Sequence, residues 1–386
     1  MKLEFQEMHA KKIVNVYKHA TGPWFWNKYS AHPYIGCRSG CEFCYLRGGI
    51  YLGRRDPEHF DTLIQVKTNA VELLHKELSR LEPDVIGCGD WQQPAEDRYQ
   101  LSRLMLEAVL EYEFPLLVIE RSDLLLRDVD LLLAFQERTW VSVVYSMSNL
   151  DPVLKAAFEP RSPGLKRRLE AIRFLADSGI PVGISLMPVI PFLGDDRAHL
   201  EEVIKTTRDY GAQFVIAGGL TMDGVQAERT LAAAGRVDPA VEQRWRQLYN
   251  GGKLSGHQSS GAEAYPARLG RLVRELCEKH GVLDRMPRYI PTGPLGVNKH
   301  LAERLFLKTY DLELEGAAPH RIWAYRKAAW TVDELKESIA MIYARKGEDG
   351  LRALPDISAS LAGHIAKWLA RENYLTAPQK PSEGQI

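Results

Sequence analysis

The stretch HPYIGCRSGCEFCYLR, residues 32–47, carries three cysteines in the spacing CxxxCxxC. Thiolates are the natural ligands of iron–sulfur clusters, and three of them hold only three irons of a four-iron, four-sulfur (4Fe-4S) cluster. The fourth iron keeps an open coordination position, which a chemical role requires. Cys37, Cys41 and Cys44 are therefore the predicted ligands of a 4Fe-4S cluster.

A zinc ion is the alternative occupant of the same cysteines. A structural zinc site needs a fourth ligand, and no second CxxC pair in the sequence supplies one. The fourth ligand would then have to be His32 or His59. The cysteine triad and the fold pattern around it favour the cluster.

Outward from this loop, short apolar runs alternate with longer amphipathic stretches between residue 30 and about residue 220. The runs are often β-branched, as in strands buried on both faces. Six strand–helix units in a row predict a parallel sheet with right-handed crossovers. Six are too few to close an eight-stranded barrel, so we predict an α/β fold, a partial (β/α)6 barrel, with its chemistry on the loops after the carboxyl ends of the strands. The predicted strands are 33–36, 84–88, 115–120, 140–147, 181–188 and 213–218.

The stretches between these runs have helical periodicity. Residues 69–81 place Leu74 and Leu78 on one stripe, with Asn69 as the predicted N-cap. The pair Asp151-Pro152 indicates a cap followed by a first-turn proline. Further helices are predicted at 96–112, 123–137, 164–178, 196–210, 238–248 and 264–281.

The length of 386 residues suits one large domain with an appendage. We assign residues 1–225 to the partial barrel, 226–318 to a mostly helical extension, 319–374 to an all-helical module and 375–386 to a flexible tail. Within the module, the TxxE pattern at 331–334 predicts the start of a second helix. Gly347 to Gly350 predict a turn, and Ser358 predicts the cap of a last helix.

Composition narrows the class of protein. Fifty basic residues balance fifty acidic ones, which argues against a chain-wide electrostatic attraction to nucleic acid. Five cysteines, three of them clustered, do not resemble a disulfide framework and indicate a reducing compartment. The beginning of the chain, MKLEFQEMHAKK, has no apolar signal region, and no apolar run is long enough to span a membrane. We expect a cytoplasmic monomer.

The cysteine stretch and five others resemble the spore photoproduct lyase family of the radical S-adenosylmethionine (SAM) superfamily. The resemblance extends through most of residues 12–220. It implies that the open iron chelates the amino and carboxylate groups of SAM, and that reduction cleaves SAM to methionine and a 5′-deoxyadenosyl radical. It also implies an electron donor such as flavodoxin or ferredoxin. The five further stretches are VKTNAVELLHKEL, GDWQQPAEDRYQLSRLMLEAV, ERSDLLLRDVDLL, FEPRSPGLKRRLEAI and GISLMPVIPFLGDD.

Five positions match SAM contacts of the family by this resemblance. Tyr45 is expected near the adenine, and Asp90, after the second strand, near the amino group. Arg121 replaces a lysine of the family and is expected to pair with the SAM carboxylate. Ser146 is expected to bond the ribose or carboxylate, and Met187 to lie against the adenine. The alternatives are a position on the surface for Arg121, a hydroxyl that merely ends a strand for Ser146, and packing for Met187.

The resemblance further implies a hydrogen-atom donor. In spore photoproduct lyases a cysteine near the end of the second strand returns a hydrogen atom to the thymine radical. Cys88 has this position, on the same face as the cysteine loop, and Tyr45 is the second candidate catalytic residue. A packed thiol is the alternative for Cys88. The sequence departs from the family at Gly89-Asp90, which requires a one-residue shift, and at Phe43, where the lyases have a tyrosine implicated in radical relay.

The stretch LRALPDISASLAGHIAKWL, residues 351–369, resembles the second hairpin of helix–hairpin–helix domains. In those domains a glycine-rich hairpin presents backbone N–H groups to a phosphate of DNA. Here Asp356, Ile357 and Ser358 occupy the hairpin, so two glycines are lost and an aspartate stands where phosphate would approach. DNA contact and a structural role both stay open for the module.

Two functions follow from these patterns. The first is repair of a thymine photoproduct in DNA by a carbon–carbon lyase that resembles spore photoproduct lyase, with lesion-containing DNA as substrate. The second is a radical SAM enzyme that modifies a nucleoside, a tRNA or a peptide.

Overall fold

The computed structural model describes residues 2–20, 25–48, 55–249 and 265–371. They form two compact units. The first comprises Met1–Tyr17 and Asn27–Met286, and the second comprises Lys18–Trp26 and Pro287–Ile386, within the described ranges. None of the helices in these ranges is both long and apolar enough to cross a membrane. The predicted tail at 375–386 lies outside the described residues.

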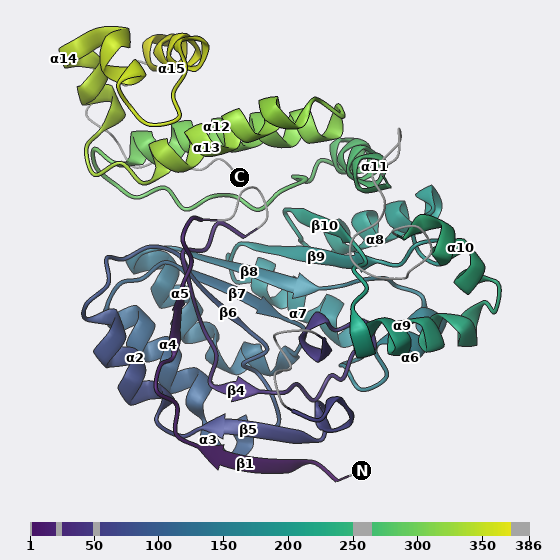
Figure 1. Ribbon diagram of the computed structural model, residues 1–386. Helices are drawn as coiled ribbons and strands as arrows, with labels where there is room; N and C mark the ends of the chain where they lie inside the picture. The colour runs from purple at the N-terminus through teal and green to yellow at the C-terminus, as the bar shows by residue number, and fades with distance from the viewer. Residues whose placement is uncertain (1, 21–24, 49–54, 250–264, 372–386) are drawn as a thin grey trace. The chain divides into compact units, whose positions relative to one another are not determined.

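A seven-stranded sheet forms the centre of the first unit (Figure 1). Its strands are β2 (Val14–Val16), β3 (Tyr29–Ala31), β6 (Ile86–Gly89), β7 (Leu116–Glu120), β8 (Val141–Ser146), β9 (Val182–Val189) and β10 (Val215–Gly219). They lie in the order β10-β9-β8-β7-β6-β3-β2, with β2 antiparallel to β3 and the other neighbours parallel. Six parallel strands leave a barrel open, which confirms the predicted α/β partial barrel.

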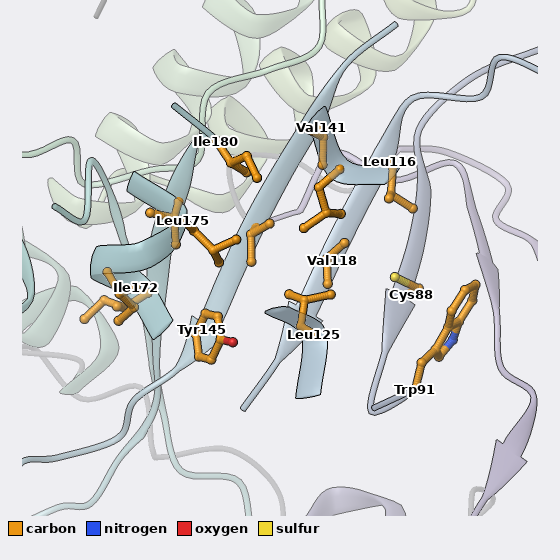
Figure 2. Close-up of a cluster of buried hydrophobic side chains, with 14 of the residues drawn as sticks. Cys88, Trp91, Leu116, Val118, Leu125, Val141, Tyr145, Ile172, Leu175 and Ile180 are labelled. Carbon is orange, nitrogen blue, oxygen red and sulfur yellow. The ribbon is translucent and has the colours of Figure 1, made fainter. Parts of the chain in front are cut away.

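Strand residues alternate between the two faces of a sheet. The main core lies on the face that the helices cover. Ile86, Val118, Val143 and Ile184 all point into one buried apolar cluster, part of which is shown in Figure 2. Each such side chain contributes about 1.5–3 kcal/mol when it leaves water. The alternate positions, on the opposite face, are mixed: they are small or polar at Gly87, Gly89, Ser142, Ser146 and Ser185, and apolar at Leu117, Ile119 and Val144.

The prediction for the first strand was wrong. Residues 33–36 were expected to open the barrel, but the main sheet takes β3 (Tyr29–Ala31) instead. Pro33 follows, and because proline has no N–H to donate, the run is interrupted there. The next two residues form β4 (Tyr34–Ile35) of a separate three-stranded sheet with β1 (Glu4–Met8) and β5 (Leu63–Lys67), in the order β1-β5-β4.

The helices that follow the strands match the predicted stretches, with two interruptions. Gln100 has a left-handed backbone (φ 50°), which divides the stretch 96–112 into two helices. The stretch 123–137 begins as a 3-10 helix, η3 (Asp123–Asp128). The helices are α2 (Ala70–Leu78), α3 (Glu96–Tyr99), α4 (Leu101–Glu111), α5 (Val129–Arg138), α6 (Pro152–Phe158), α7 (Leu165–Asp177) and α8 (Arg197–Asp209).

The two N-caps predicted in the first unit have different outcomes. Asp151 caps α6 as expected, because its carboxylate accepts from the N–H groups of Val153 (2.6 Å) and Leu154 (3.4 Å). Asn69 precedes α2 but does not cap it. Its side chain instead bonds both backbone groups of Ala10 at 2.9 Å, so it ties the helix start to the N-terminal segment.

Three further helices complete the first unit: α9 (Gly224–Val237), α10 (Val241–Leu248) and α11 (Tyr265–His280). Parts of α6, α9 and α10 enclose a second buried cluster that contains Phe43, Phe158 and Trp245. Helix α11 packs on the main core and buries Cys277 there, in agreement with its predicted packing role.

The second unit is helical. It contains α12 (Gly296–Leu314), α13 (Pro319–Asp333), α14 (Ile339–Arg352) and α15 (Ala359–Arg371). Helix α12 packs along α13, so the chain divides at Met286 and not at the expected positions 225 and 318. The segment Lys18–Trp26 joins this unit through His19, which stacks on Trp330 with ring centroids 4.4 Å apart.

Within this unit the predicted helix start at Thr331 was wrong, because Thr331 lies inside α13 and the next helix begins after Ser338. Gly347 is non-helical (φ 59°), in agreement with the predicted turn. Ser358 accepts from the N–H of Leu361 at 3.3 Å, which confirms it as the cap of α15.

Candidate active site

The three cysteines of the loop lie together in the first unit. Cys37 and Cys41 are buried, and Cys44 is half-buried. Two backbone hydrogen bonds wind the loop into successive turns: Gly40 N–H donates to Cys37 O, and Cys44 N–H donates to Cys41 O, both at 3.2 Å. The sulfur atoms are near enough that Cys41 and Cys44 both raise the pKa of Cys37, after burial and Asp90.

Gly40 is required at its position because both its conformation and its surroundings exclude a side chain. Its φ is +57°, a region that L-residues rarely adopt. A β carbon there would lie 2.7 Å from Asp61 Oδ2 and 2.8 Å from Arg161 Nη2. The inside of the loop therefore touches a fixed acidic group.

Asp61 stabilises the loop through two arginines, of which Arg47 is buried and Arg161 is partly exposed. It pairs with Arg47 Nη2 at 3.1 Å and with Arg161. Arg47 is fully buried and donates to Cys41 O (3.3 Å) and Pro57 O (3.0 Å). These bonds fix the backbone of the cysteine motif. The sequence of the motif did not identify Asp61 as part of the site.

Gln93 joins the cysteine loop to the loop after β6. Its amide nitrogen donates to Gly36 O (3.2 Å) and Asp90 O (2.8 Å), and its amide oxygen accepts from Arg38 N–H (3.1 Å). Asp90 has a left-handed backbone (φ 55°) and is half-buried. Its charge raises the pKa of Cys37 and of Cys44. Asp90, the predicted contact for the amino group of SAM, therefore lies beside the cysteines.

Arg121, at the carboxyl end of β7, reaches the loop directly. Its Nη1 donates to Cys41 Sγ at 3.0 Å and pairs with Glu159 Oε2 at 3.2 Å. Burial alone would lower the pKa of Arg121, but Cys41 and Glu159 outweigh burial and raise it. Arg121 is therefore a charged group inside the site, and the alternative of a surface arginine was wrong.

Glu159 is, after Asp61, a second residue of the site that sequence reasoning missed. Burial by itself would raise its pKa, but Arg168 and Arg121 outweigh burial and lower the pKa to about 2. Its carboxylate also accepts from Ser162 Oγ at 3.1 Å and from Ser148 Oγ. The signal available was its position in FEPRSPGLKRRLEAI, where an acidic residue among apolar ones precedes several arginines.

Burial dominates the electrostatics of the thiols. It raises the pKa of Cys41 to about 12 and that of Cys44 to about 11, and it raises the pKa of Cys37 well above its ordinary value. Metal ligands must be deprotonated, so a metal bound by these thiols would release protons.

Ser146 ends β8, and Met187 lies two residues before the end of β9, both on the face opposite the main core. Both are half-buried. Met187 packs on β10, because a β carbon on Gly218 would lie 3.2 Å from Met187 Cγ. Both predicted residues therefore lie on the face of the sheet that is opposite the main core.

Two aromatic residues of the motif have opposite surroundings. Tyr45 begins the 3-10 helix η1 (Tyr45–Arg47) and is 59% exposed. Phe43 is buried in the second cluster, with its ring stacked on Phe158 at a centroid distance of 6.4 Å. Phe43 therefore packs as a core residue beneath α6 and α9.

Cys88 is not on the face of the cysteine loop, and that prediction was wrong. Its side chain belongs to the main core and lies among Trp91, Val118 and Leu125 (Figure 2). Because strand residues alternate, Gly87 and Gly89 take the opposite face of β6. Burial raises the pKa of Cys88 well above its ordinary value, as expected for a packed thiol.

The histidines proposed for zinc pair elsewhere. His59 lies 3.3 Å from Asp56, and the His32 ring contacts Gly89 O at 3.4 Å. Across the described ranges, no three His, Cys, Asp or Glu side chains are grouped to hold a single metal ion. A 4Fe-4S cluster instead takes each thiolate on a different iron, and three thiols in one glycine-containing loop fit that donor set.

Polar groups of the kinds that SAM requires follow three neighbouring strands, and two of these groups, Asp90 and Arg121, lie beside the cysteines. Asp90, Arg121 and Ser146 come from the carboxyl ends of β6, β7 and β8. Asn149, after β8, is buried, and its Oδ1 has no hydrogen-bond partner among the described residues. An acidic, a basic and two neutral polar groups match the amino, carboxylate and ribose groups of the cofactor.

Comparisons with known proteins agree with this fold. No protein-family model matches the chain. A cysteine-to-alanine variant of spore photoproduct lyase superposes with a TM-score of 0.51 at 14% identity, over 73% of this chain and 82% of the lyase. The same kind of variant with dinucleoside spore photoproduct also gives 0.51, over 73% and 81%. At this identity the likeness concerns the fold, a partial radical SAM barrel.

Sequence relatives are more similar to the chain. An uncharacterized protein of Methanocaldococcus jannaschii, MJ0683, is 28% identical over 214 residues, which cover 55% of this chain and 78% of the relative. The uncharacterized protein Rv2578c of Mycobacterium tuberculosis is 30% identical over 256 residues, which cover 65% of this chain and 75% of the relative. Because that identity extends over three quarters of the relative, the chain belongs to the same protein family as Rv2578c.

Proposed function

We propose that this protein is a radical SAM enzyme. The observation that carries the proposal is the position of three thiols from one loop, two of them buried and one half-buried, beside the residues that follow β6 and β7 in a partial barrel of six parallel strands. Chemistry in such barrels occurs at the carboxyl ends of the strands.

In this proposal Cys37, Cys41 and Cys44 hold a 4Fe-4S cluster, and the cluster with SAM supplies a 5′-deoxyadenosyl radical. The residues of the chain position and shield that chemistry. Asp90 is suited to the amino group of SAM because it is the acidic group beside Cys37 and Cys44. Burial of the thiols keeps water from the reaction. Electrons would come from a small donor protein such as flavodoxin or ferredoxin.

The first candidate substrate is a thymine photoproduct in DNA. The likeness in fold to spore photoproduct lyase, over 82% of the lyase chain, supports it. A lesion in DNA must leave the base stack to reach a buried site, and the second unit offers exposed cations on α14 and α15, such as Lys346 and Lys367.

The second candidate is another substrate: a nucleoside, a tRNA or a peptide. Two placements favour it. Cys88 is buried in the main core, which disfavours it as a donor that returns a hydrogen atom to a substrate. Phe43 is packed against Phe158 and has no hydroxyl for relay.

One assay separates the possibilities. The cluster is reconstituted anaerobically, SAM and dithionite are added, and 5′-deoxyadenosine is followed with and without UV-irradiated DNA. We expect SAM cleavage in the wild type, none in Cys37→Ala, and wild-type cleavage in Cys277→Ala, the matched control that removes a buried thiol from α11. Thymine released from the lesion supports the first candidate, and cleavage without repair supports the second. SAM cleavage by Cys37→Ala would refute the proposal.

Contact of the second unit with DNA has its own test in the full chain. Charge reversal of Lys346 and Lys367 together should weaken binding of UV-irradiated DNA at low salt, because phosphate contacts dominate affinity. The control is the same double reversal at Lys166 and Lys205, exposed lysines of the first unit. Equal binding by both double variants would exclude these lysines of α14 and α15 as a DNA contact.

A further inference from the structure

Arg121 makes a contact that pairing with SAM does not require. Its guanidinium donates directly to Cys41 Sγ at 3.0 Å. We propose that Arg121 sets the reduction potential of the cluster through this hydrogen bond, which makes the cluster easier to reduce. The inference rests on the proposed function in one respect, namely that Cys41 binds iron.

The position of the guanidinium is fixed from the other side by Glu159. The same Nη1 that bonds the sulfur lies 3.2 Å from Glu159 Oε2. Only 14% of the Arg121 side chain is exposed, so there is little solvent for the charge to turn toward. A displaced guanidinium would leave both the sulfur and a buried carboxylate short of a donor.

Glu159 is itself held by a network that leaves it immobile. Its Oε2 pairs with Arg168 Nη2 and accepts from Ser162 Oγ, and its Oε1 accepts from Ser148 Oγ. The Arg168 side chain has no exposed surface, and that of Glu159 is 2% exposed. The carboxylate is shared by two guanidinium groups, so the three groups together carry one net positive charge beside Cys41.

The direction of the effect follows from electrostatics. Reduction transfers one electron from the reductant to the cluster, with no bond made or broken in the protein, and makes the cluster and its thiolates more negative. A donated hydrogen bond and a positive charge stabilise that state more than the oxidised one, the more so in a buried site. Loss of Arg121 therefore shifts the reduction potential to more negative values.

A redox titration without SAM tests this role separately from a role in SAM binding. The variants are Arg121→Gln, which removes the charge, and Arg121→Lys, which keeps the charge on a side chain without the planar fork. Arg167→Gln is the matched control, because Arg167 is an exposed arginine paired with Asp123 at 2.7 Å. Electron paramagnetic resonance of the reconstituted proteins measures the reduced cluster, and iron content measures loading.

We expect a fall of about tenfold in the ratio of reduced to oxidised cluster for Arg121→Gln at a fixed solution potential, which is about 59 mV for one electron. Arg121→Lys should shift less in the same direction, and Arg167→Gln should not shift.

Equal potentials for wild type and Arg121→Gln, with equal iron content, would overturn the inference and leave the proposed function intact. If Arg121→Gln fails to load a cluster, Arg121→Lys decides: a more negative potential supports the inference and an unchanged one overturns it. The proposed function would instead be overturned if the wild-type protein held no cluster, or if the wild type and Cys37→Ala held the same cluster.

Discussion

Replacement of Gly40 by alanine should disturb the cysteine loop through a steric contact, beyond the strain of its backbone. A β carbon at this position would lie 2.7 Å from Asp61 Oδ2, and φ is +57°. Gly179 is the matched control. Its φ is +80°, yet nothing lies within 4 Å of a β carbon there. The two variants share the backbone strain, and only Gly40→Ala adds the contact.

The magnitude follows from what must move. Alanine in the left-handed region costs about 1–2 kcal/mol at either site. At Gly40 the carboxylate of Asp61 must also shift, although it is paired with buried Arg47 at 3.1 Å. Complete loss of one partner of a buried ion pair costs about 3–5 kcal/mol. Displacement is less severe, so we expect about 2–4 kcal/mol for Gly40→Ala and about 1–2 kcal/mol for Gly179→Ala.

Thermal unfolding of the metal-free proteins measures the difference, at about 2–4 °C for each kcal/mol. Iron content after anaerobic reconstitution measures the consequence for the loop. Gly179→Ala should bind iron like the wild type, whereas Gly40→Ala should bind less. Equal melting temperatures and equal iron content for the two variants would refute the reasoning that Asp61 packs against the inside of the loop.

Three further predictions concern buried groups. Cys88→Ala should keep the wild-type rate of 5′-deoxyadenosine formation and lose about 1 kcal/mol of stability, because the thiol only fills the core; an inactive but folded variant would contradict its placement. Phe43→Tyr should lower the melting temperature, because it introduces a hydroxyl into the buried apolar cluster that contains Phe158, at a cost of about 1–3 kcal/mol. A higher rate of 5′-deoxyadenosine formation in this variant would contradict a purely structural role for Phe43. Burial and Asp90 raise the pKa of Glu120 to about 8, so the folded protein holds a proton that the unfolded chain releases, and stability falls as the pH rises toward 8. Glu120→Gln should therefore melt higher relative to the wild type at about pH 9 than at about pH 6, and a constant difference would contradict the raised pKa.

The fold was largely accessible from the sequence because buried parallel strands leave apolar runs. The five later strands, from β6 to β10, lie within one or two residues of their predicted runs. The first strand was misplaced because Tyr29–Ala31 is a run of only three residues and Pro33 interrupts it. The division of the chain depends on the packing of α12 on α13, which no local pattern reveals.

The site was accessible only where local pattern carried the chemistry. Cys37, Cys41 and Cys44 follow from spacing, and Arg121 from its place at a strand end. The role of Glu159 depends on contacts with residues that are 38 and 11 positions away, Arg121 and Ser148. The side of the sheet taken by Cys88 depends on the register of β6, where a change of one residue exchanges the two faces.

The amide of Gln93, in the loop after β6, makes two hydrogen bonds to the cysteine loop and a third to Asp90 O in its own loop. The two loops therefore behave as one interlocking part, although they are separated along the chain. A chimera that receives the cysteine motif of another protein must receive the matching β6 loop as well. If either loop is transplanted alone, the amide of Gln93 loses its matching partners. The unit that can be exchanged between proteins is therefore the cysteine loop together with the loop after β6.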